Sequence, residues 1–266
     1  MNGAECLMQT ARDAGIDVCF ANPGTTEMPL VAAMDSVPGL RAILGLFEGV
    51  CTGAADGYGR MTDRAAMTLL HLGPGFANGI ANLHNARRAG SPVVNLVGDH
   101  TTSHAAYDAP LTSDILSLAR PVSGWLHTNG SAKELAADFA AAVAAAVGPP
   151  SQVATLIIPA DCQWEAAEGP VPIRPPGGPR VDGARVEAAA EALHAAKRPA
   201  LLLGGRALRQ TGWQGARLTE RSWRQAVRRR LAELDWPSLR RDVEKLLEAG
   251  ERAEWMTSRT LVQLLS

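Results

Sequence analysis

Apolar residues in the first part of the chain follow two spacings that predict two kinds of element. After Asn2, apolar side chains recur at the spacing of one helical face, at Ala4, Leu7, Met8 and Ala11. Asn2 with Glu5 three positions later predicts a capping box at the start of this helix, and Gly15 predicts its end. The run Val18-Cys19-Phe20 is short and continuously apolar, so we expect a buried strand there.

The same alternation of helix and strand patterns continues to about residue 160. Further strands are predicted at residues 42–44, 66–70, 93–97 and 153–158, and helices at residues 48–58, 77–88 and 131–147. Between the first strand and the next helix, Asn22-Pro23-Gly24 predicts a turn, with Thr25 or Thr26 as the helix cap. Strands that alternate with helices indicate an α/β fold, with a parallel sheet covered by helices on both faces.

The pattern changes after residue 165. Residues 166–183 are rich in proline and glycine and predict a linker outside regular structure. A helix at residues 186–197 and a strand at residues 199–205 predict the start of a second α/β domain, over residues 184–212, that stops after one unit. Residues 213–266 predict a helical tail without a strand.

Composition narrows the class of protein. Hydrophobic residues make up 46% of the chain, enough for a large core, and the net charge of -1 gives no indication of a nucleic-acid or anionic-membrane partner. No apolar run reaches the length of a membrane span, and the first residues lack the pattern of a secretory signal. The cysteines are scattered, as expected for core residues in a reducing compartment. We therefore expect a cytoplasmic protein without membrane association.

Two patterns imitate known binding sites. His100 and His104 have a spacing that suits a metal ion, but the Thr-Thr-Ser between them favours a loop over a helix. Residues 73–79 imitate a dinucleotide fingerprint, but the spacing to the last glycine is wrong. From these patterns we expect neither a metal site nor a nicotinamide site.

Glu48 is the residue whose setting points most directly to chemistry. It lies at the predicted junction of a strand and a helix, among the apolar residues Leu44, Leu46, Phe47 and Val50. Burial among such neighbours disfavours a charged carboxylate, which can then hold or donate a proton near neutral pH. The alternative is a solvent-facing glutamate in the first turn of a helix, where the helix dipole favours its charge.

Short segments of unusual composition occur in a fixed order between residues 22 and 98. They are Asn-Pro-Gly at residues 22–24, a glutamate followed by Ala-Asp-Gly-Tyr at residues 48–58, Gly-Pro-Gly at residues 73–75 and Ser-Pro-Val at residues 91–93. Their order resembles the N-terminal, pyrimidine-binding domain of the thiamine-diphosphate enzymes, the family of acetolactate synthase and benzoylformate decarboxylase. The resemblance covers residues 1–165 and implies decarboxylation or carboligation of 2-oxo acids such as pyruvate.

The resemblance also implies roles for individual residues. In that family the glutamate at the position of Glu48 hydrogen-bonds a ring nitrogen of the cofactor's aminopyrimidine and favours the tautomer that removes a proton from the thiazolium carbon. Pro23 and Gly24 would line the pyrimidine pocket, while Pro74 and Asn78 would contact the ring. The cofactor that the resemblance implies is thiamine diphosphate.

His71 and Asp99 depart from the acetolactate synthases, which carry a small hydroxyl residue and usually a glutamine at these positions. A histidine is similar to the decarboxylases, where it acts as a catalytic acid or base; the alternative is a hydrogen-bonded histidine that closes a strand. Three functions therefore stay open. They are an acetolactate synthase-like transferase, a benzoylformate- or sulfopyruvate-decarboxylase-like lyase, and a non-catalytic remnant.

The family holds the diphosphate through magnesium in a third domain, and no matching segment occurs in this sequence. No Gly-Asp-Gly with a downstream Asn-Asn follows residue 210. We therefore expect a truncated chain that is incomplete on its own, with magnesium bound elsewhere. Its expected partner is a second copy of the chain or a separate diphosphate-binding subunit.

Overall fold

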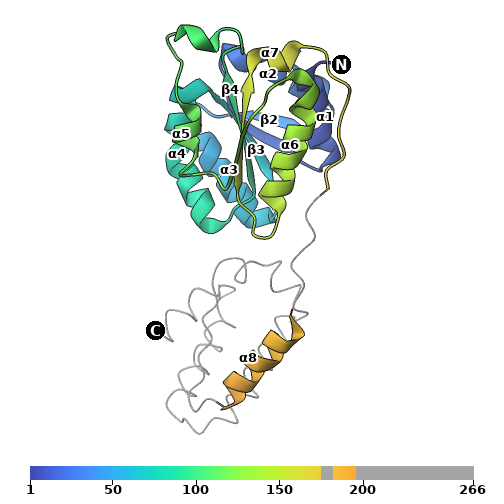
Figure 1. Ribbon diagram of the computed structural model, residues 1–266, viewed down its shortest axis with the longest axis vertical. Coiled ribbons are helices and arrows are strands. Elements are labelled where there is room, and N and C mark those ends of the chain that lie inside the picture. The colour runs from blue at the N-terminus through green and yellow to red at the C-terminus, as the bar shows by residue number, and fades with distance from the viewer. Residues whose placement is uncertain (175–181, 196–266) are drawn as a thin grey trace, which may run out of the picture. The chain divides into compact units, whose positions relative to one another are not determined.

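Six parallel strands form a sheet in the first part of the chain (Figure 1). The computed structural model describes residues 1–174 and 182–195. The strands lie in the order β2-β1-β3-β4-β6-β5, and each neighbouring pair is parallel. Their bounds are β1 Val18–Asn22, β2 Arg41–Leu44, β3 Ala66–His71, β4 Val93–Asp99, β5 Trp125–Thr128 and β6 Val153–Pro159. The predicted parallel α/β sheet is confirmed.

Helices cover both faces of the sheet (Figure 1). One face carries α1 (Gly3–Asp13), α2 (Met28–Ser36) and α6 (Ala132–Val147), and the other carries α3 (Glu48–Thr62), α4 (Leu72–Ala89) and α5 (Ile115–Ala119). The short helix α7 (Ala160–Trp164) follows β6 and contacts α1 and α6. Two 3-10 turns, η1 (Thr25–Glu27) and η2 (Ala105–Tyr107), lie in connections.

The first helix begins at the capping box that the sequence predicts. The Glu5 amide donates to Oδ1 of Asn2 at 2.8 Å, and the Asn2 amide donates to Oε2 of Glu5 at 3.0 Å. Two backbone N–H groups that a helix start leaves without partners are thereby satisfied. The helix then buries its apolar face, including Leu7 and Met8, against the sheet.

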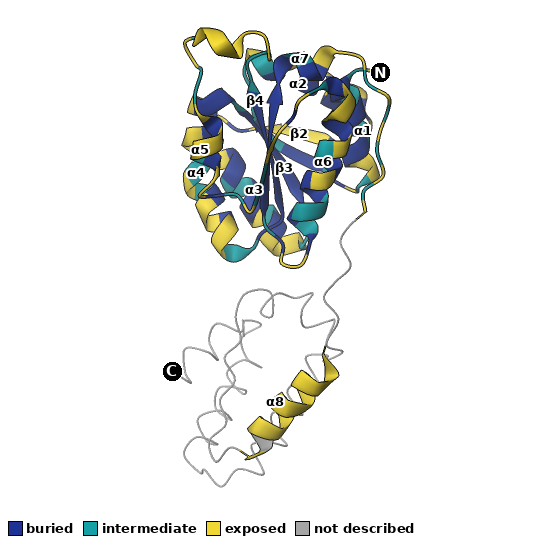
Figure 2. Ribbon diagram, viewed as in Figure 1, coloured by how far each residue is buried: buried dark blue, intermediate teal, exposed yellow. Residues whose placement is uncertain are grey.

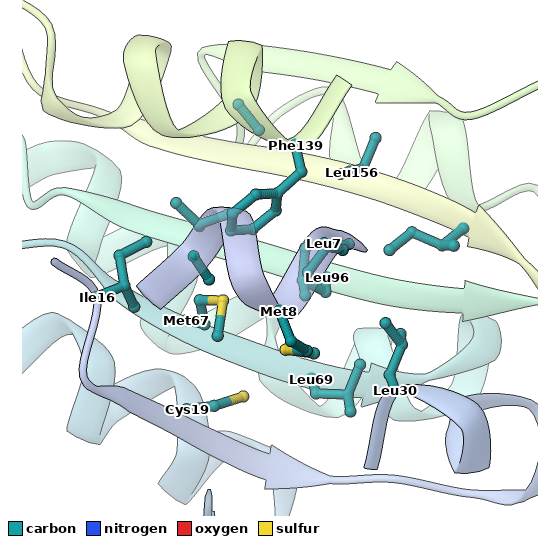
Figure 3. Close-up of a cluster of buried hydrophobic side chains, with 14 of the residues drawn as sticks. Leu7, Met8, Ile16, Cys19, Leu30, Met67, Leu69, Leu96, Phe139 and Leu156 are labelled. Atoms are coloured by element: carbon teal, nitrogen blue, oxygen red, sulfur yellow. The ribbon is translucent and has the colours of Figure 1, made fainter. Parts of the chain in front are cut away.

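The core is divided by the sheet into two apolar layers. Figure 3 shows the layer in which Leu7 of α1 and Phe139 of α6 lie over side chains of the central strands, such as Leu96 and Leu156. The opposite layer joins Phe76 and Leu83 of α4 to the other side of the same strands. Because both faces are covered, β3, β4 and β6 are almost continuously buried (Figure 2).

Strand β2 differs from the central strands because it lies at the edge of the sheet. All four of its residues are exposed, and Leu44 keeps 68% of its surface accessible (Figure 2). The apolar composition of β2 therefore predicts the strand correctly but not its burial. An edge strand has a neighbour on one side only, so its apolar side chains need a further element to cover them.

The structure corrects the sequence predictions at several connections. Helix α4 begins at Leu72, five residues before the predicted start at residue 77, so the Gly-Pro-Gly segment forms its first turn. Leu72 has a φ of 50°, which reverses the chain sharply between β3 and α4. Neither Thr25 nor Thr26 is a helix cap: Gly24 precedes η1, and Glu27 precedes α2. Short elements were missed at β5, α5 and α7 because they carry too few residues for a periodic pattern.

The chain divides into two compact units, Met1–Arg180 and Val181–Ser266. In the second unit the structure describes α8 (Gly183–Ala195), which overlaps the helix predicted at residues 186–197. The predicted strand at residues 199–205 and the predicted helical tail lie outside the described residues. The division into four parts, with boundaries at residues 165, 183 and 212, stays a prediction.

The described part of the chain lacks two kinds of feature. None of the described helices combines the length and the hydropathy needed to cross a membrane. Within residues 1–174 and 182–195, histidine, cysteine, aspartate and glutamate do not gather in a group of three that could hold a metal ion.

Candidate active site

The predicted site residues lie at the end of the sheet formed by the carboxyl ends of its parallel strands. Asn22 closes β1, His71 closes β3 and Asp99 closes β4. His71 is in register with Gly98, the residue before Asp99. In open parallel sheets the carboxyl ends of the strands are where ligands bind, because the connecting loops and helix starts converge there.

Glu48 is the first residue of α3, at the exit from edge strand β2. Its Oε2 accepts a hydrogen bond from the amide nitrogen of Asn78 at 3.0 Å. The fold thus brings together Glu48 and Asn78, two of the predicted cofactor-binding residues that lie 30 positions apart in sequence.

The apolar neighbours of Glu48 in sequence do not bury it within this chain. Leu44 is 68% exposed, Leu46 92%, Phe47 50% and Val50 59%. Leu44 ends the edge strand, Leu46 and Phe47 lie in the connection to α3, and Val50 lies in the first turn of α3. The prediction that they desolvate Glu48 is therefore wrong for the isolated chain, where Glu48 is half-buried.

Close packing between α3 and α4 holds Glu48 in place. The Thr52 hydroxyl donates to the carbonyl of Gly79 at 3.0 Å, and the Asn82 amide donates to the carbonyl of Gly49 at 2.7 Å. A Cβ atom at Gly79 would lie 2.9 Å from the Thr52 side chain, so glycine permits this approach. The two helices together therefore set the distance between Glu48 and Asn78.

Glu48 and His71 flank the start of α4. A Cβ atom at Gly75 would lie 3.2 Å from Oε1 of Glu48 and 3.3 Å from Cβ of His71. The backbone of Gly75 therefore lies between the two side chains, and a larger residue at this position would crowd both. Pro74 and Asn78, one turn apart on α4, are both exposed next to this position.

His71 is held by Glu27, a residue that no sequence pattern identifies as part of the site. Its Nδ1 lies 2.8 Å from Oε2 of Glu27 and 3.2 Å from the hydroxyl oxygen of Thr26. The Glu27 side chain is completely buried, while that of His71 is 21% exposed. Glu27 lies just after the Asn-Pro-Gly segment, but no local pattern indicates its burial, because its partner is 44 positions away.

The turn at the end of β1 packs against His71. A side chain at Gly24 would overlap the His71 ring, so glycine is required for the backbone to pass so close. The Gly24 amide donates to Oε2 of Glu27 at 2.7 Å. Pro23, which precedes it at the end of β1, is half-buried.

Asp99 and His100 lie beside this cluster. Burial raises the pKa of Asp99, although the backbone amide of His100 donates to its Oδ1 at 2.8 Å. Nε2 of His100 is buried and lacks a hydrogen-bond partner among the described residues. The His100 and His104 rings meet edge-on with centroids 5.8 Å apart, in the connection that leads to η2.

Known sequences and structures resemble this chain over most of its length. The protein IlvX of Mycobacterium tuberculosis, named as an acetolactate synthase large subunit, is 53% identical over 220 residues, which are 81% of this chain and 42% of that protein. Benzoylformate decarboxylase of Pseudomonas aeruginosa is 32% identical over 200 residues, which are 73% of this chain and 37% of the relative. This chain thus spans less than half the length of these two relatives.

A solved structure agrees with the sequence comparisons. The thiamine diphosphate-dependent 4-hydroxybenzoylformate decarboxylase of Rhodococcus jostii superposes with a TM-score of 0.71 at 25% identity, over 77% of this chain and 40% of that one. Residues 1–118 match the family described as thiamine pyrophosphate enzyme, N-terminal TPP binding domain. The resemblance seen in the motif order is confirmed, and the chain belongs to the thiamine pyrophosphate enzyme family as an N-terminal, acetolactate synthase-like TPP-binding domain.

Proposed function

We propose that this chain supplies the pyrimidine-binding half of an active site that decarboxylates or ligates 2-oxo acids. The observation that carries the proposal is the pairing of Glu48 with Asn78 at the carboxyl edge of the sheet, beside Gly75. The amide of Asn78 orients the Glu48 carboxylate, and Gly75 beside it carries no side chain. This arrangement suits a flat aromatic ring with a nitrogen that can form a hydrogen bond to the carboxylate.

The residues present fit the aminopyrimidine end of thiamine diphosphate. Gly24 and Gly75 let the backbone pass close to His71 and Glu48, which holds both side chains at the carboxyl ends of the strands. Glu48, Asn78, Pro23, Gly24 and Pro74 are the residues we propose to hold the ring. Thiamine diphosphate, when bound, supplies an electron sink for breaking the bond next to the carbonyl of a 2-oxo acid.

Two protein groups would move protons in this site. Glu48 would exchange a proton with the ring nitrogen of the aminopyrimidine, while Asn78 keeps its carboxyl oriented. His71 would act as the second acid or base, since its ring is partly exposed at the same edge. Both residues are proposed as catalytic.

The reaction is either that of an acetolactate synthase or that of a lyase. The 53% identity with IlvX supports the transferase. His71 supports the alternative, a benzoylformate- or sulfopyruvate-decarboxylase-like lyase, because an imidazole can protonate the product of decarboxylation where a small hydroxyl cannot. A non-catalytic remnant is the third possibility that the experiments below distinguish.

A partner would complete the site. We propose that a separate subunit holds the diphosphate and magnesium, and that the chain pairs with this subunit or with a second copy of itself. Support comes from a surface that we call the edge patch, which consists of Ile43, Leu44, Leu46, Phe47 and Val50. These exposed apolar side chains surround Glu48 in sequence, so a partner that covers them would also bury Glu48.

The compartment that we propose is the cytoplasm. The four cysteines of the chain are buried and free, as expected in a reducing environment.

Calorimetry with thiamine diphosphate and magnesium tests the proposed function. The full chain is titrated alone and then with the protein encoded by a neighbouring reading frame. We expect saturable heat in at least one titration, and we expect Glu48→Gln to weaken it. A lack of binding in both titrations would support the non-catalytic remnant and exclude the proposed function.

A further inference from the structure

We infer that Glu27 fixes the tautomer of His71, so that Nε2 of the His71 ring is the proton acceptor at this edge of the sheet. The use of that proton rests on the proposed function, whereas the hydrogen-bond network is a property of this chain alone. Glu27 is thus a positioning residue that acts through His71.

The Glu27 carboxylate accepts hydrogen bonds at both of its oxygens. Its side chain is completely buried, yet the Gly24 amide donates to Oε2 at 2.7 Å and the Thr26 hydroxyl donates to Oε1. Buried polar groups are hydrogen-bonded, and here both donors use the carboxylate oxygens as acceptors. Glu27 therefore presents lone pairs to its remaining neighbour, His71.

The same geometry determines which nitrogen of His71 carries the hydrogen. Nδ1 lies 2.8 Å from Oε2 of Glu27 and 3.2 Å from the Thr26 oxygen. The single hydroxyl hydrogen of Thr26 is directed to Glu27, so both neighbours of Nδ1 are acceptors. Nδ1 must then carry the hydrogen, and in the neutral ring the lone pair is on Nε2.

The packing around the pair prevents other arrangements. A side chain at Gly24 would overlap the His71 ring, and one at Gly98 would overlap the Glu27 carboxylate. The two glycines lie in different elements, the η1 connection and β4, and both approach the pair through their backbones. Nε2 of His71 has no hydrogen-bond partner among the described residues, and the side chain is 21% exposed, so a ligand can reach it.

This arrangement defines the direction of proton transfer. Nε2 takes a proton from a bound group, and the resulting imidazolium has its charge balanced by the Glu27 carboxylate at 2.8 Å. The proton returns from Nε2 in the reverse step. The hydrogen on Nδ1 stays on the ring throughout and remains hydrogen-bonded to Glu27. His71 therefore begins as a base and becomes an acid only after it has been protonated.

Nuclear magnetic resonance of the nitrogen-15-labelled full chain tests the inference without cofactor. Imidazole nitrogens with and without hydrogen differ in shift, and His71→Gln identifies the His71 signals by their loss. We expect His71 as the Nδ1–H tautomer. His127 is an internal control, because its Nε2 lies 3.1 Å from Oδ2 of Asp138 and should carry the hydrogen instead.

Two variants test whether Glu27 or Thr26 determines the tautomer of His71. Glu27→Met removes the acceptor, and the Nε2–H tautomer of His71 should then become populated. Thr26→Val keeps Glu27, so Nδ1–H should persist, and this variant serves if Glu27→Met does not fold. A wild-type His71 with hydrogen on Nε2, or a change of tautomer in Thr26→Val, would overturn the inference. Neither result depends on whether the chain binds thiamine diphosphate.

Discussion

Two glutamates at the carboxyl edge of the sheet differ in their surroundings, and this difference separates their roles. Glu27 is fully buried and receives hydrogen bonds from Gly24 and Thr26 in addition to its pairing with His71. Glu48 is half-buried and receives one side-chain hydrogen bond, from Asn78. A carboxylate whose partners are all supplied by the protein orients other groups, whereas one with free lone pairs can bind a ligand.

Glu48→Gln should abolish exchange of the C2 proton of thiamine diphosphate in any complex that binds it, because an amide cannot exchange a proton with the pyrimidine nitrogen. The oxygen of the glutamine can still accept from Asn78, so we expect the free energy of unfolding to change by less than about 1 kcal/mol. Deuterium exchange followed by proton NMR measures the first effect, and urea unfolding measures the second. Glu134→Gln, in the first turn of α6, is the control that should keep wild-type exchange.

Gly98→Ala should destabilise the fold by about 1–3 kcal/mol, because the added methyl group overlaps the buried Glu27 carboxylate. Gly57→Ala is a matched control for which the free energy of unfolding should increase. A Cβ atom at Gly57 meets no atom within 4 Å, and an exposed helical glycine replaced by alanine stabilises by about 0.5–1 kcal/mol. Urea unfolding of both variants measures the two values, and equal stability of Gly98→Ala and the wild type would contradict the packing described for Glu27.

At the scale of elements, polar contacts join α3 to the loop before β1. The Tyr58 hydroxyl donates to Oδ1 of Asp17 at 2.7 Å, and Arg64 pairs with Asp17 at 3.1 Å. Asp17 directly precedes β1, so these contacts connect the helix that begins at Glu48 to the strand that leads to Gly24. The contacts of Asp17 therefore help to position Glu48, at the start of α3, relative to Gly24, which follows β1.

Asp17→Asn should reduce the loss of stability in acid. The Tyr58 hydrogen bond, followed by the charge of Arg64, lowers the pKa of Asp17 below its ordinary value of 3.8. A lowered folded pKa contributes stability that is present above pH 3.8 and is lost as the pH falls through the folded value. Because Asp17 is 41% exposed, we expect solvent screening to limit the effect to less than about 1 kcal/mol.

Urea unfolding between about pH 5 and pH 2 measures this dependence. The free energy of unfolding should fall less steeply in Asp17→Asn than in the wild type. Tyr58→Phe removes the main cause of the shift and should flatten the curve in the same direction. Curves of both variants that are parallel to that of the wild type would show that the Tyr58 contact does not stabilise the charged Asp17.

At the scale of the molecule, the edge patch is the feature that the sheet itself leaves uncovered. Its members follow one another from β2 into α3, and Leu46 is 92% exposed. An exposed apolar surface on an edge strand favours association with another protein. The position of Glu48 inside this sequence makes the patch and the proposed site parts of one surface.

Leu46→Asp should prevent association of the chain with its partner, because a charge placed in an apolar interface loses its hydration. The fold should be unaffected, since Leu46 makes little contact within the chain. Analytical ultracentrifugation of the chain, alone and with a candidate subunit, gives the oligomeric state. Leu116→Asp, a partly exposed position on α5 outside the patch, should associate like the wild type. Unchanged association of Leu46→Asp would exclude the edge patch as the interface.

Much of the fold could be predicted from the sequence because its long elements have strong local patterns. The buried strands β3, β4 and β6 are continuous apolar runs, and α1 carries both its cap and its apolar face within 13 residues. The short elements β5 and α5 could not be predicted, because four or five residues do not establish a period. The motif order likewise identified the family and placed Glu48, Asn78 and His71 among its candidates, since such motifs are local in the chain.

The sequence by itself therefore determined the longer elements, the family and the chemical type of the candidate residues. The tertiary structure alone decided that Glu27 meets His71 and that the neighbours of Glu48 are exposed. The pairing depends on the return of β3 to a position beside β1, and the exposure depends on β2 being the edge strand. Both follow from the order of strands in the sheet. Contacts between segments that are distant in sequence set this order, so local residue patterns do not predict it.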